Sequence, residues 1–287
     1  NISRWRRTVC GDLTSAFQPF DHDKATSLES PTRDAFLEQI HRAQFKKPPA
    51  DFRVLTQQEI DAVRRDPHAS PLLPHQEPGV RRSCALPYEL AVDGSLNDER
   101  THFKIRFEAR TEVFGKVSAG SPFIVHARTA NGAVQVRNYA VAAGEHLEDA
   151  WPVAAFENGV YHIRVYGPNG FFREFVGSHQ DPPVDVQFDY VRTGPRESAL
   201  SGDVEIVAVN RDRRDVHTIE VRDNSYHNRP QTRSLAPGER VTLTVDARKA
   251  ACWYDLRVRT AKSEPFQKRY AGRVETGRFT TSDPAMG

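Results

Sequence analysis

The feature that most constrains the fold is a strict alternation of apolar and polar residues, which recurs in short runs from about residue 86 onward. Phe103, Ile105 and Phe107 point to one side of an extended chain, and the residues between them are charged. This period of two is the pattern of a half-buried antiparallel strand. The alternation recurs at 161–165, 186–190, 241–245 and 254–258, with turn signals such as Asn131-Gly132 and Pro237-Gly238 between runs. Many short strands at this spacing predict a β-sandwich.

The strand-rich region also repeats itself. YHIRV at 161–165 matches YDLRV at 254–258, which lies 93 residues later, and FFREFVG at 171–177 matches FQKRYAG at 266–272, which lies 95 residues later. A nearly constant offset indicates a tandem duplication. We therefore predict a mainly β chain with two antiparallel, Ig-like sandwiches at 85–180 and 183–282. The residues expected to be buried are Phe103, Ile105, Phe107, Ile163, Val165, Leu243, Val245, Leu256 and Val258.

Residues 1–84 have a different character, because they are rich in proline and charge and show little strand signal. Ser30-Pro31 predicts the start of a helix near 31–46. Thr56 and Glu59 have the spacing of a capping box, which predicts a second helix near 57–65. The proline-rich stretch that follows predicts an extended connector. The chain opens on Asn1 and its single methionine is Met286, so we interpret it as an excised piece of a longer polypeptide.

Charge and hydropathy exclude two classes of function. The chain has 40 Lys and Arg against 38 Asp and Glu, and a net charge of +2 is too small for a dedicated nucleic-acid binder. No apolar run approaches the roughly 20 residues of a membrane-spanning helix. The three cysteines, Cys10, Cys84 and Cys252, are far apart and form no C-x-x-C motif. Buried free thiols are the favoured interpretation, and a single disulfide is the alternative.

The sequence shows no constellation of catalytic residues. Asp21-His22-Asp23 is the best metal-like cluster, but three adjacent side chains cannot all face one ion without an unusual turn, so a solvated turn is favoured. The histidines form no H-x-H or H-E-x-x-H motif, and there is no phosphate-binding glycine loop or G-x-S-x-G elbow. We therefore predict no catalytic, cofactor-binding or metal-binding residue in this chain.

Two arginine clusters and one aromatic pair are weaker candidates for binding. The first cluster is Arg4, Arg6 and Arg7 around Trp5, which would pair with acidic groups of another domain or with phosphate. The second is Arg211, Arg213 and Arg214 on a predicted hairpin, where Asp212 and Asp215 neutralise it. Phe171 and Phe172 lie beside a turn and form either a membrane-touching tip or part of a core. The repeat favours the core, because Phe266 stands at the matching position.

Three stretches carry a resemblance to a known family. They are NISRWRRTVCGDLTSAF at 1–17, LLPHQEPGVRRSCALPYEL at 72–90, and the twice-occurring ending Y-x-[IL]-R-V…F-x-[RK]-x-[FY]-x-G. Together they resemble the C-terminal part of the bacterial phosphocholine-preferring phospholipase C family, which includes haemolytic and non-haemolytic members, and the resemblance covers the whole chain. The second copy departs slightly, because Lys268 takes the place of Arg173.

The resemblance implies two C-terminal β domains behind a catalytic domain of the alkaline-phosphatase-like class, with residues 1–84 as the tail of that domain and a connector. It implies a parent enzyme that is secreted through the periplasm and hydrolyses phosphatidylcholine-type phosphodiesters to diacylglycerol and phosphocholine. The family's nucleophile and any metal ligands lie upstream of Asn1, so this chain is expected to hold no cofactor and to be inactive alone. The implied partners are the N-terminal catalytic domain of the same polypeptide, a phospholipid surface and a secretion chaperone, and no nucleic acid.

Two other classes of function compete with this interpretation. A stand-alone tandem module that binds carbohydrate or lipid is the main alternative, but a carbohydrate binder usually shows a row of exposed aromatic residues, and Trp5, Trp151 and Trp253 form none. A purely adhesive pair of sandwiches would not need residues 1–84. That segment favours the phospholipase interpretation.

Overall fold

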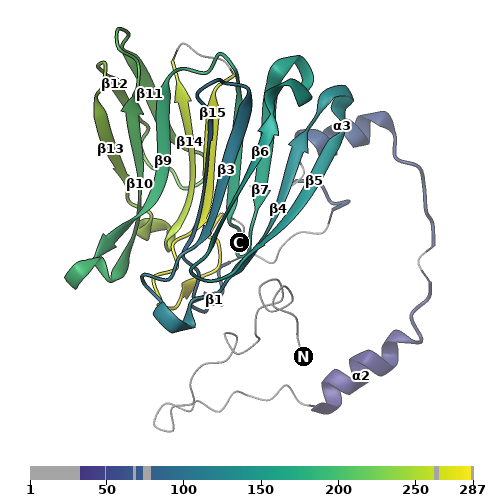
Figure 1. Ribbon diagram of the computed structural model, residues 1–287. Coiled ribbons are helices and arrows are strands. Elements are labelled where there is room, and N and C mark those ends of the chain that lie inside the picture. The colour runs from purple at the N-terminus through teal and green to yellow at the C-terminus, as the bar shows by residue number, and fades with distance from the viewer. Residues whose placement is uncertain (1–32, 49, 67–68, 74–78, 262–264, 286–287) are drawn as a thin grey trace. The chain divides into compact units, whose positions relative to one another are not determined.

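The computed structural model describes residues 33–48, 50–66, 69–73, 79–261 and 265–285, with the element order shown in Figure 1. Residues 17–78 belong to one compact unit and residues 79–287 to another. The first of these contains the helices α2 (Arg33–Ala43) and α3 (Gln57–Arg65). The predicted capping box is present, since Glu59 N donates to Thr56 Oγ1 at 3.3 Å and Thr56 N donates to Glu59 at 2.9 Å. The helix predicted near 31–46 ends earlier than expected, at Ala43, and its predicted start at Ser30-Pro31 lies outside the described residues.

The unit from residue 79 onward is built from β-strands. They are β1 (Arg82–Ser83), β2 (Leu90–Leu96), β3 (His102–Ala109), β4 (Ser121–Arg128), β5 (Val134–Val141), β6 (His146–Pro152), β7 (Val160–Tyr166), β8 (Phe172–Ser178), β9 (Val184–Thr193), β10 (Ala199–Asn210), β11 (His217–Asp223), β12 (Gln231–Leu235), β13 (Arg240–Val245), β14 (Trp253–Thr260), β15 (Gln267–Arg273) and β16 (Thr280–Thr281). The described strand pairs are antiparallel. β1 pairs with β16, which ties the start of this unit to its end.

Two sandwiches follow from the strand order. In the first, the sheet β2-β3-β6 covers the strands β8-β7-β4-β5, and in the second, the sheet β9-β10-β13 covers the strands β15-β14-β11-β12. The predicted mainly β fold with two tandem antiparallel sandwiches is confirmed. The nine residues expected to be buried are all buried, because the inward positions of each strand fill one of two separate hydrophobic cores.

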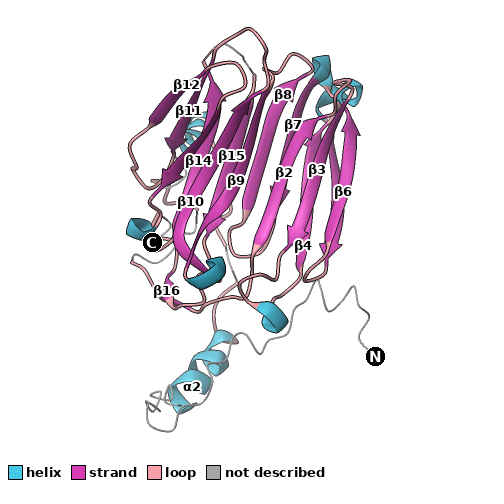
Figure 2. Ribbon diagram, turned by 60° about the vertical axis from the view of Figure 1, so that its left-hand side comes forward, coloured by secondary structure: helices cyan, strands magenta, loops and turns pink. Residues whose placement is uncertain are grey.

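One eight-stranded sheet runs through both sandwiches, in the order β12-β11-β14-β15-β8-β7-β4-β5 (Figure 2). The two halves join where β15 pairs with β8, and Arg269 lies directly opposite Glu174. These two residues are equivalents in the repeat, since they are 95 positions apart. An antiparallel pair centred on equivalent residues means that an approximate two-fold axis relates the sandwiches. A residue on that axis therefore faces its own counterpart.

Packing explains the glycine that ends each copy of the repeated motif, Gly177 in the first and Gly272 in the second. A Cβ added to Gly177 would lie 2.3 Å from the hydroxyl oxygen of Tyr161, and one added to Gly272 would lie 3.0 Å from that of Tyr254. Tyr161 donates to Asp181, and Tyr254 lies 3.2 Å from the guanidinium of Arg173. The glycine that ends the motif therefore leaves room for the hydroxyl of the tyrosine that begins it.

Candidate functional site

Several residues singled out in the sequence lie outside the described residues, namely Asp21-His22-Asp23 and the arginines at 4, 6 and 7. Among the residues that the structure does describe, no three His, Cys, Asp or Glu side chains gather in a way that could hold a metal ion. No helix in the described part of the chain is long and apolar enough to cross a membrane. Of the two described cysteines, which are both free, Cys252 is buried and Cys84 is exposed.

The loop with the second arginine cluster is not the predicted hairpin. β10 pairs with β9 and β13, whereas β11 pairs with β12 and β14, so the loop from Asn210 to His217 crosses from one sheet to the other. The expected neutralisation of the arginines by Asp212 and Asp215 is not seen among the described residues, because Arg211 pairs with Asp185 outside the loop and Asp212 pairs with His217. The backbone amide of Arg214 and the ring of His217 lower the pKa of Asp212 to about 2, and Arg211 pairs with Asp185 at 2.6 Å. This cluster is a solvated loop.

The preference for a core position is correct for Phe171 and wrong for Phe172. Phe171 and its counterpart Phe266 are both buried. Phe172 points to the opposite face of β8 and stays partly exposed, with its ring 5.3 Å from that of Tyr166.

The junction of the two sandwiches contains a fully buried cation. Arg173 leaves β8 and enters the second sandwich, where it donates to the carbonyl of Ala271 at 3.0 Å and to the hydroxyl of Tyr254 at 3.2 Å. Its guanidinium carbon lies 4.0 Å from the ring centre of Phe171 and 4.5 Å from that of Phe188. Stacking of this kind suits a guanidinium, which is planar and weakly hydrated.

Lys268, the counterpart of Arg173, crosses the junction in the opposite direction. Its ammonium group donates to the carbonyl of Gly94 in the first sandwich at 2.8 Å and to that of Val186 at 2.6 Å. Asp93 lies 3.8 Å from it and accepts a hydrogen bond from Tyr270 at 2.8 Å. Burial lowers the pKa of Lys268, and the charge of Asp93 opposes that effect. Each sandwich thus places a cation in the other.

Further polar contacts hold the same junction. Arg192 of the second sandwich pairs with Glu89 of the first, whose side chain is fully buried, and Arg110 pairs with Asp189 at 2.8 Å. Burial raises the pKa of Glu89, and the charge of Arg192 opposes it. Breaking a buried pair is costly, so these contacts fix the two sandwiches as one body.

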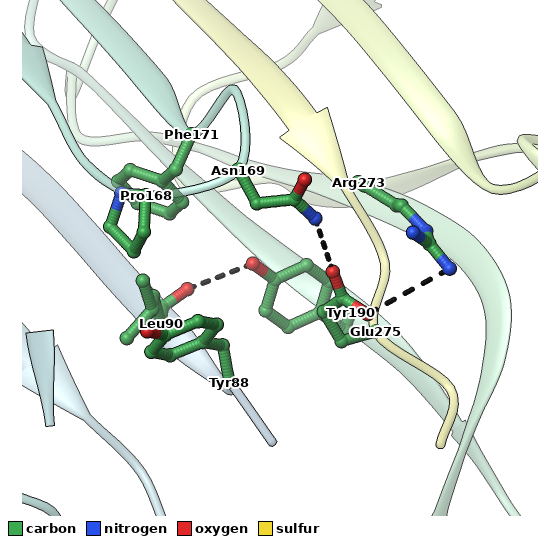
Figure 3. A pocket seen from close by; sticks show the side chains of 8 residues that line it. All are labelled: Tyr88, Leu90, Pro168, Asn169, Phe171, Tyr190, Arg273 and Glu275. Carbon is green, nitrogen blue, oxygen red and sulfur yellow. Dashed lines mark hydrogen bonds and ion pairs between the residues drawn. The ribbon is translucent and has the colours of Figure 1, made fainter. Parts of the chain in front are cut away.

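A small cavity lies at this junction (Figure 3). Tyr190 donates to the carbonyl of Leu90 at 2.9 Å on one side, and Asn169 donates to Glu275 on the other. The volume is about 10 Å³, which is room for about one water molecule. A phospholipid headgroup does not fit, so this cavity is part of the packing.

Two larger hollows flank the linker between the sandwiches, with volumes of about 670 and 340 Å³. Both are lined by Arg100 and Asp181. Arg100 donates to the carbonyls of His179 and Asp181 at 3.0 and 2.6 Å, and the Asp181 carboxylate accepts from Tyr161 and from Ser178 N. These polar groups hold the linker in place, so we assign the hollows a structural role.

The outer face of the eight-stranded sheet is the candidate functional surface. Directly paired residues share a face, and the register places one row of seven side chains across seven strands. The row is Val136, His126, Arg164, Glu174, Arg269, Arg257 and Arg222. Sequence reasoning missed this row, because it depends on which strands are neighbours.

The first half of this face combines apolar and basic residues. Ile124, Val134, Val136 and Tyr166 are between 36% and 57% exposed. A hollow of about 270 Å³ opens among them, lined by His126, Arg128, Gly132, Val134, His162 and Arg164. Glu174 lies at its edge, 2.8 Å from His162 Nε2 and 2.7 Å from Arg164 Nε. Burial raises the pKa of Glu174, and these hydrogen bonds outweigh it and lower the pKa to about 2.

The second half of the face is basic, because Arg222, Arg257, Arg259 and Arg269 outnumber Glu220 and Asp255. Arg257 lies opposite Arg222 on one side and Arg269 on the other. Arg269 is neutralised by Asp255 through two hydrogen bonds of 2.7 Å, but within the described chain Arg222 and Arg257 form no ion pair. Partial burial and the charges of Arg259 and Arg222 lower the pKa of Arg257. Like charges directly opposite one another are unfavourable, so this half is suited to an anion.

Comparison with known proteins gives one family and several relatives. A family model described as the bacterial phospholipase C C-terminal domain matches residues 82–178 and, a second time, residues 183–273. The non-hemolytic phospholipase C of Pseudomonas aeruginosa is 34% identical over 100% of this chain and 38% of its own length. The non-hemolytic phospholipase C of Burkholderia pseudomallei is 35% identical over 100% and 37%. The hemolytic phospholipase C of Pseudomonas aeruginosa is 30% identical over 100% and 39%. The chain therefore spans less than two fifths of each relative.

Proposed function

Because the chain belongs to the bacterial phospholipase C family and carries its C-terminal domain twice, we propose that it is the accessory region of a secreted phospholipase C. The parent enzyme would hydrolyse phosphatidylcholine-type phosphodiesters to diacylglycerol and phosphocholine. The two sandwiches would present the enzyme to its lipid, and residues 1–84 would form the tail of the catalytic domain of the same polypeptide and the connector.

The observation that carries this proposal is the apolar surface of the described residues between 33 and 73. Large apolar side chains are exposed there, with Phe52 at 85% and Val54 at 92%. The full set is Leu37, Ile40, Phe45, Phe52, Val54, Leu55, Leu72 and Leu73. Exposed apolar side chains in this number favour contact with a partner, which we propose is the catalytic domain. The sandwiches, in contrast, have closed cores of their own.

The proposal that the catalytic domain, and not the sandwiches, carries out the reaction follows from the chemistry of phosphodiester cleavage. Cleavage of a phosphodiester needs an activated nucleophile and stabilisation of charge on the phosphoryl oxygens, commonly by a bound metal. Among the described residues, Arg173 and Lys268 are buried at the junction of the sandwiches. The carboxylate of Asp181 accepts hydrogen bonds from Tyr161 and from the backbone amide of Ser178. The catalytic domain would therefore supply the nucleophile and any metal. A secretion chaperone remains a proposed partner of the sandwiches.

The test is the activity of the purified 287-residue chain. It should not hydrolyse phosphatidylcholine or a chromogenic phosphocholine ester, and addition of the separately produced catalytic part should restore turnover of the ester. The matched control is a chain that begins at residue 86, which should restore none because it lacks the apolar segment. Metal-dependent turnover by the chain alone, abolished by Asp21→Asn or His22→Ala, would overturn the proposal.

A further inference from the structure

We infer that the outer face of the eight-stranded sheet docks on an anionic phospholipid surface, with its aliphatic half at the lipid interface and its arginine half on the phosphates. This inference rests on the proposed function and names the surface and the lipid charge that it would use. Four features of the face carry it.

The first feature is the aliphatic cluster. Ile124, Val134 and Val136 lie on the neighbouring strands β4 and β5, and Ile124 is directly opposite Tyr166 on β7. Phe172 continues that line on β8, because it pairs with Tyr166. Exposed apolar side chains on adjacent strands form a continuous patch, and an aromatic ring with a polar end suits a lipid interface.

The second feature is the basic hollow beside this patch. Four of its six lining residues are histidine or arginine, and its volume of about 270 Å³ is enough for a phosphate group. Glu174 already occupies one side of the Arg164 guanidinium. Arg128 is exposed and, within the described chain, forms no ion pair, so its charge is available to an anion.

The third feature is the arginine row of the second half. Arg222 and Arg257 lie on β11 and β14 at directly opposed positions, so their side chains project side by side from one face. A shared phosphate would remove the repulsion between them, because a guanidinium can bind phosphate through two parallel hydrogen bonds.

The fourth feature distinguishes a membrane from a nucleic acid. Nucleic-acid surfaces interleave basic residues with aromatic rings on which bases stack. Here the two rings of the patch, Tyr166 and Phe172, already contact each other. The more exposed residues Ile124, Val134 and Val136 are aliphatic, and they gain free energy at a lipid interface without stacking on bases. The two halves lie on one continuous sheet (Figure 2).

The experiment measures the binding of the whole chain to vesicles by co-sedimentation. One set of vesicles contains phosphatidylcholine alone, and the other contains phosphatidylcholine with about 30% phosphatidylglycerol, which makes the surface anionic. The chain should bind the anionic vesicles more tightly. The double variant R222Q/R257Q should lower its partition coefficient on them by about 30-fold, since each basic residue near an anionic surface contributes about 1 kcal/mol. The variant V134S/V136S should weaken binding to both kinds of vesicle.

The matched control is K104Q/R240Q, which removes the same charge from the three-stranded sheets and should leave binding within about twofold. Thermal unfolding of all variants shows whether they are folded. The inference is overturned if the chain binds neither kind of vesicle or both equally, if the control loses as much as R222Q/R257Q, or if a single-stranded oligonucleotide binds more tightly than the anionic vesicles. Those outcomes leave the proposed accessory role untouched, because complementation with the soluble ester tests that separately.

Discussion

The last strands of the two sandwiches, β8 and β15, are equivalent in the repeat but carry different charges. Glu174 and Arg269 face each other on the approximate two-fold axis. Two identical residues there would place like charges in contact, so the copies had to diverge at this point to become complementary. The residues that bind this pair also differ in charge between the two copies. In the first sandwich His162 binds Glu174, and in the second its equivalent Asp255 binds Arg269.

Arg173 and Lys268 extend this comparison into the interior. Both are buried cations that cross the junction, but Arg173 stacks among aromatic rings whereas Lys268 binds two carbonyl groups. A planar guanidinium can satisfy the first environment and a compact ammonium the second. The two domains therefore share one fold, but the residues at their junction differ between the copies so that each side complements the other.

The largest effect is expected at Arg173. The Arg173→Met variant leaves the Tyr254 hydroxyl and the Ala271 carbonyl without their donor. We expect the free energy of unfolding to fall by about 3 kcal/mol, measured by urea denaturation. Arg233→Met changes an exposed arginine on β12 and should change stability by less than about 0.5 kcal/mol. Equal effects of the two substitutions would show that the buried arginine does not hold the junction.

A smaller effect is expected at Lys268. Lys268→Met removes the donor to Gly94 and Val186 and leaves Asp93 without its cation. The flexible methionine fills much of the space, so we expect a loss of about 2 kcal/mol. Lys104→Met, on the exposed side of β3, is the control. A Lys268→Met chain as stable as wild type would contradict the proposed asymmetry.

The smallest of the three effects is expected at Glu174 and depends on pH. Its pKa is about 2 in the folded chain against an ordinary value of 4.5, so its contribution is present above pH 4.5 and is lost as the pH falls toward 2. Glu174→Gln should therefore cost about 1 to 2 kcal/mol at pH 7, with the difference from wild type shrinking toward pH 2. Thermal unfolding across this range measures it. A difference that does not change with pH would refute the charged interaction.

Much of the fold could be predicted from the sequence, because alternation and turn residues act locally. The strands around Phe103, Ile163 and Leu256 and the capping box of α3 are examples. The prediction of a hairpin at Arg211 was wrong. The sequence of a turn-rich loop is the same whether the chain returns to its own sheet or crosses to the other sheet.

The pairing of β8 with β15 could not be predicted, because it joins residues about 95 positions apart and leaves no periodic signal. The candidate surface depends on that pairing and on strand order. Arg222, Arg257 and Arg269 are scattered in the sequence and become neighbours only when β11, β14 and β15 lie side by side. The resemblance to a family supplied the proposed role, but it did not indicate which face carries it.

The most direct test of the account uses a parent phospholipase C that ends at residue 78 in this numbering, just before the compact unit of the sandwiches begins. We expect it to turn over a soluble phosphocholine ester at close to the rate of the intact enzyme, because on the proposed division it keeps the catalytic domain and the tail assigned to that domain. On vesicles of phosphatidylcholine that also contain phosphatidylglycerol, its rate should fall by about tenfold or more. Parallel loss on both substrates would contradict the account, since it would make the sandwiches part of the catalytic fold.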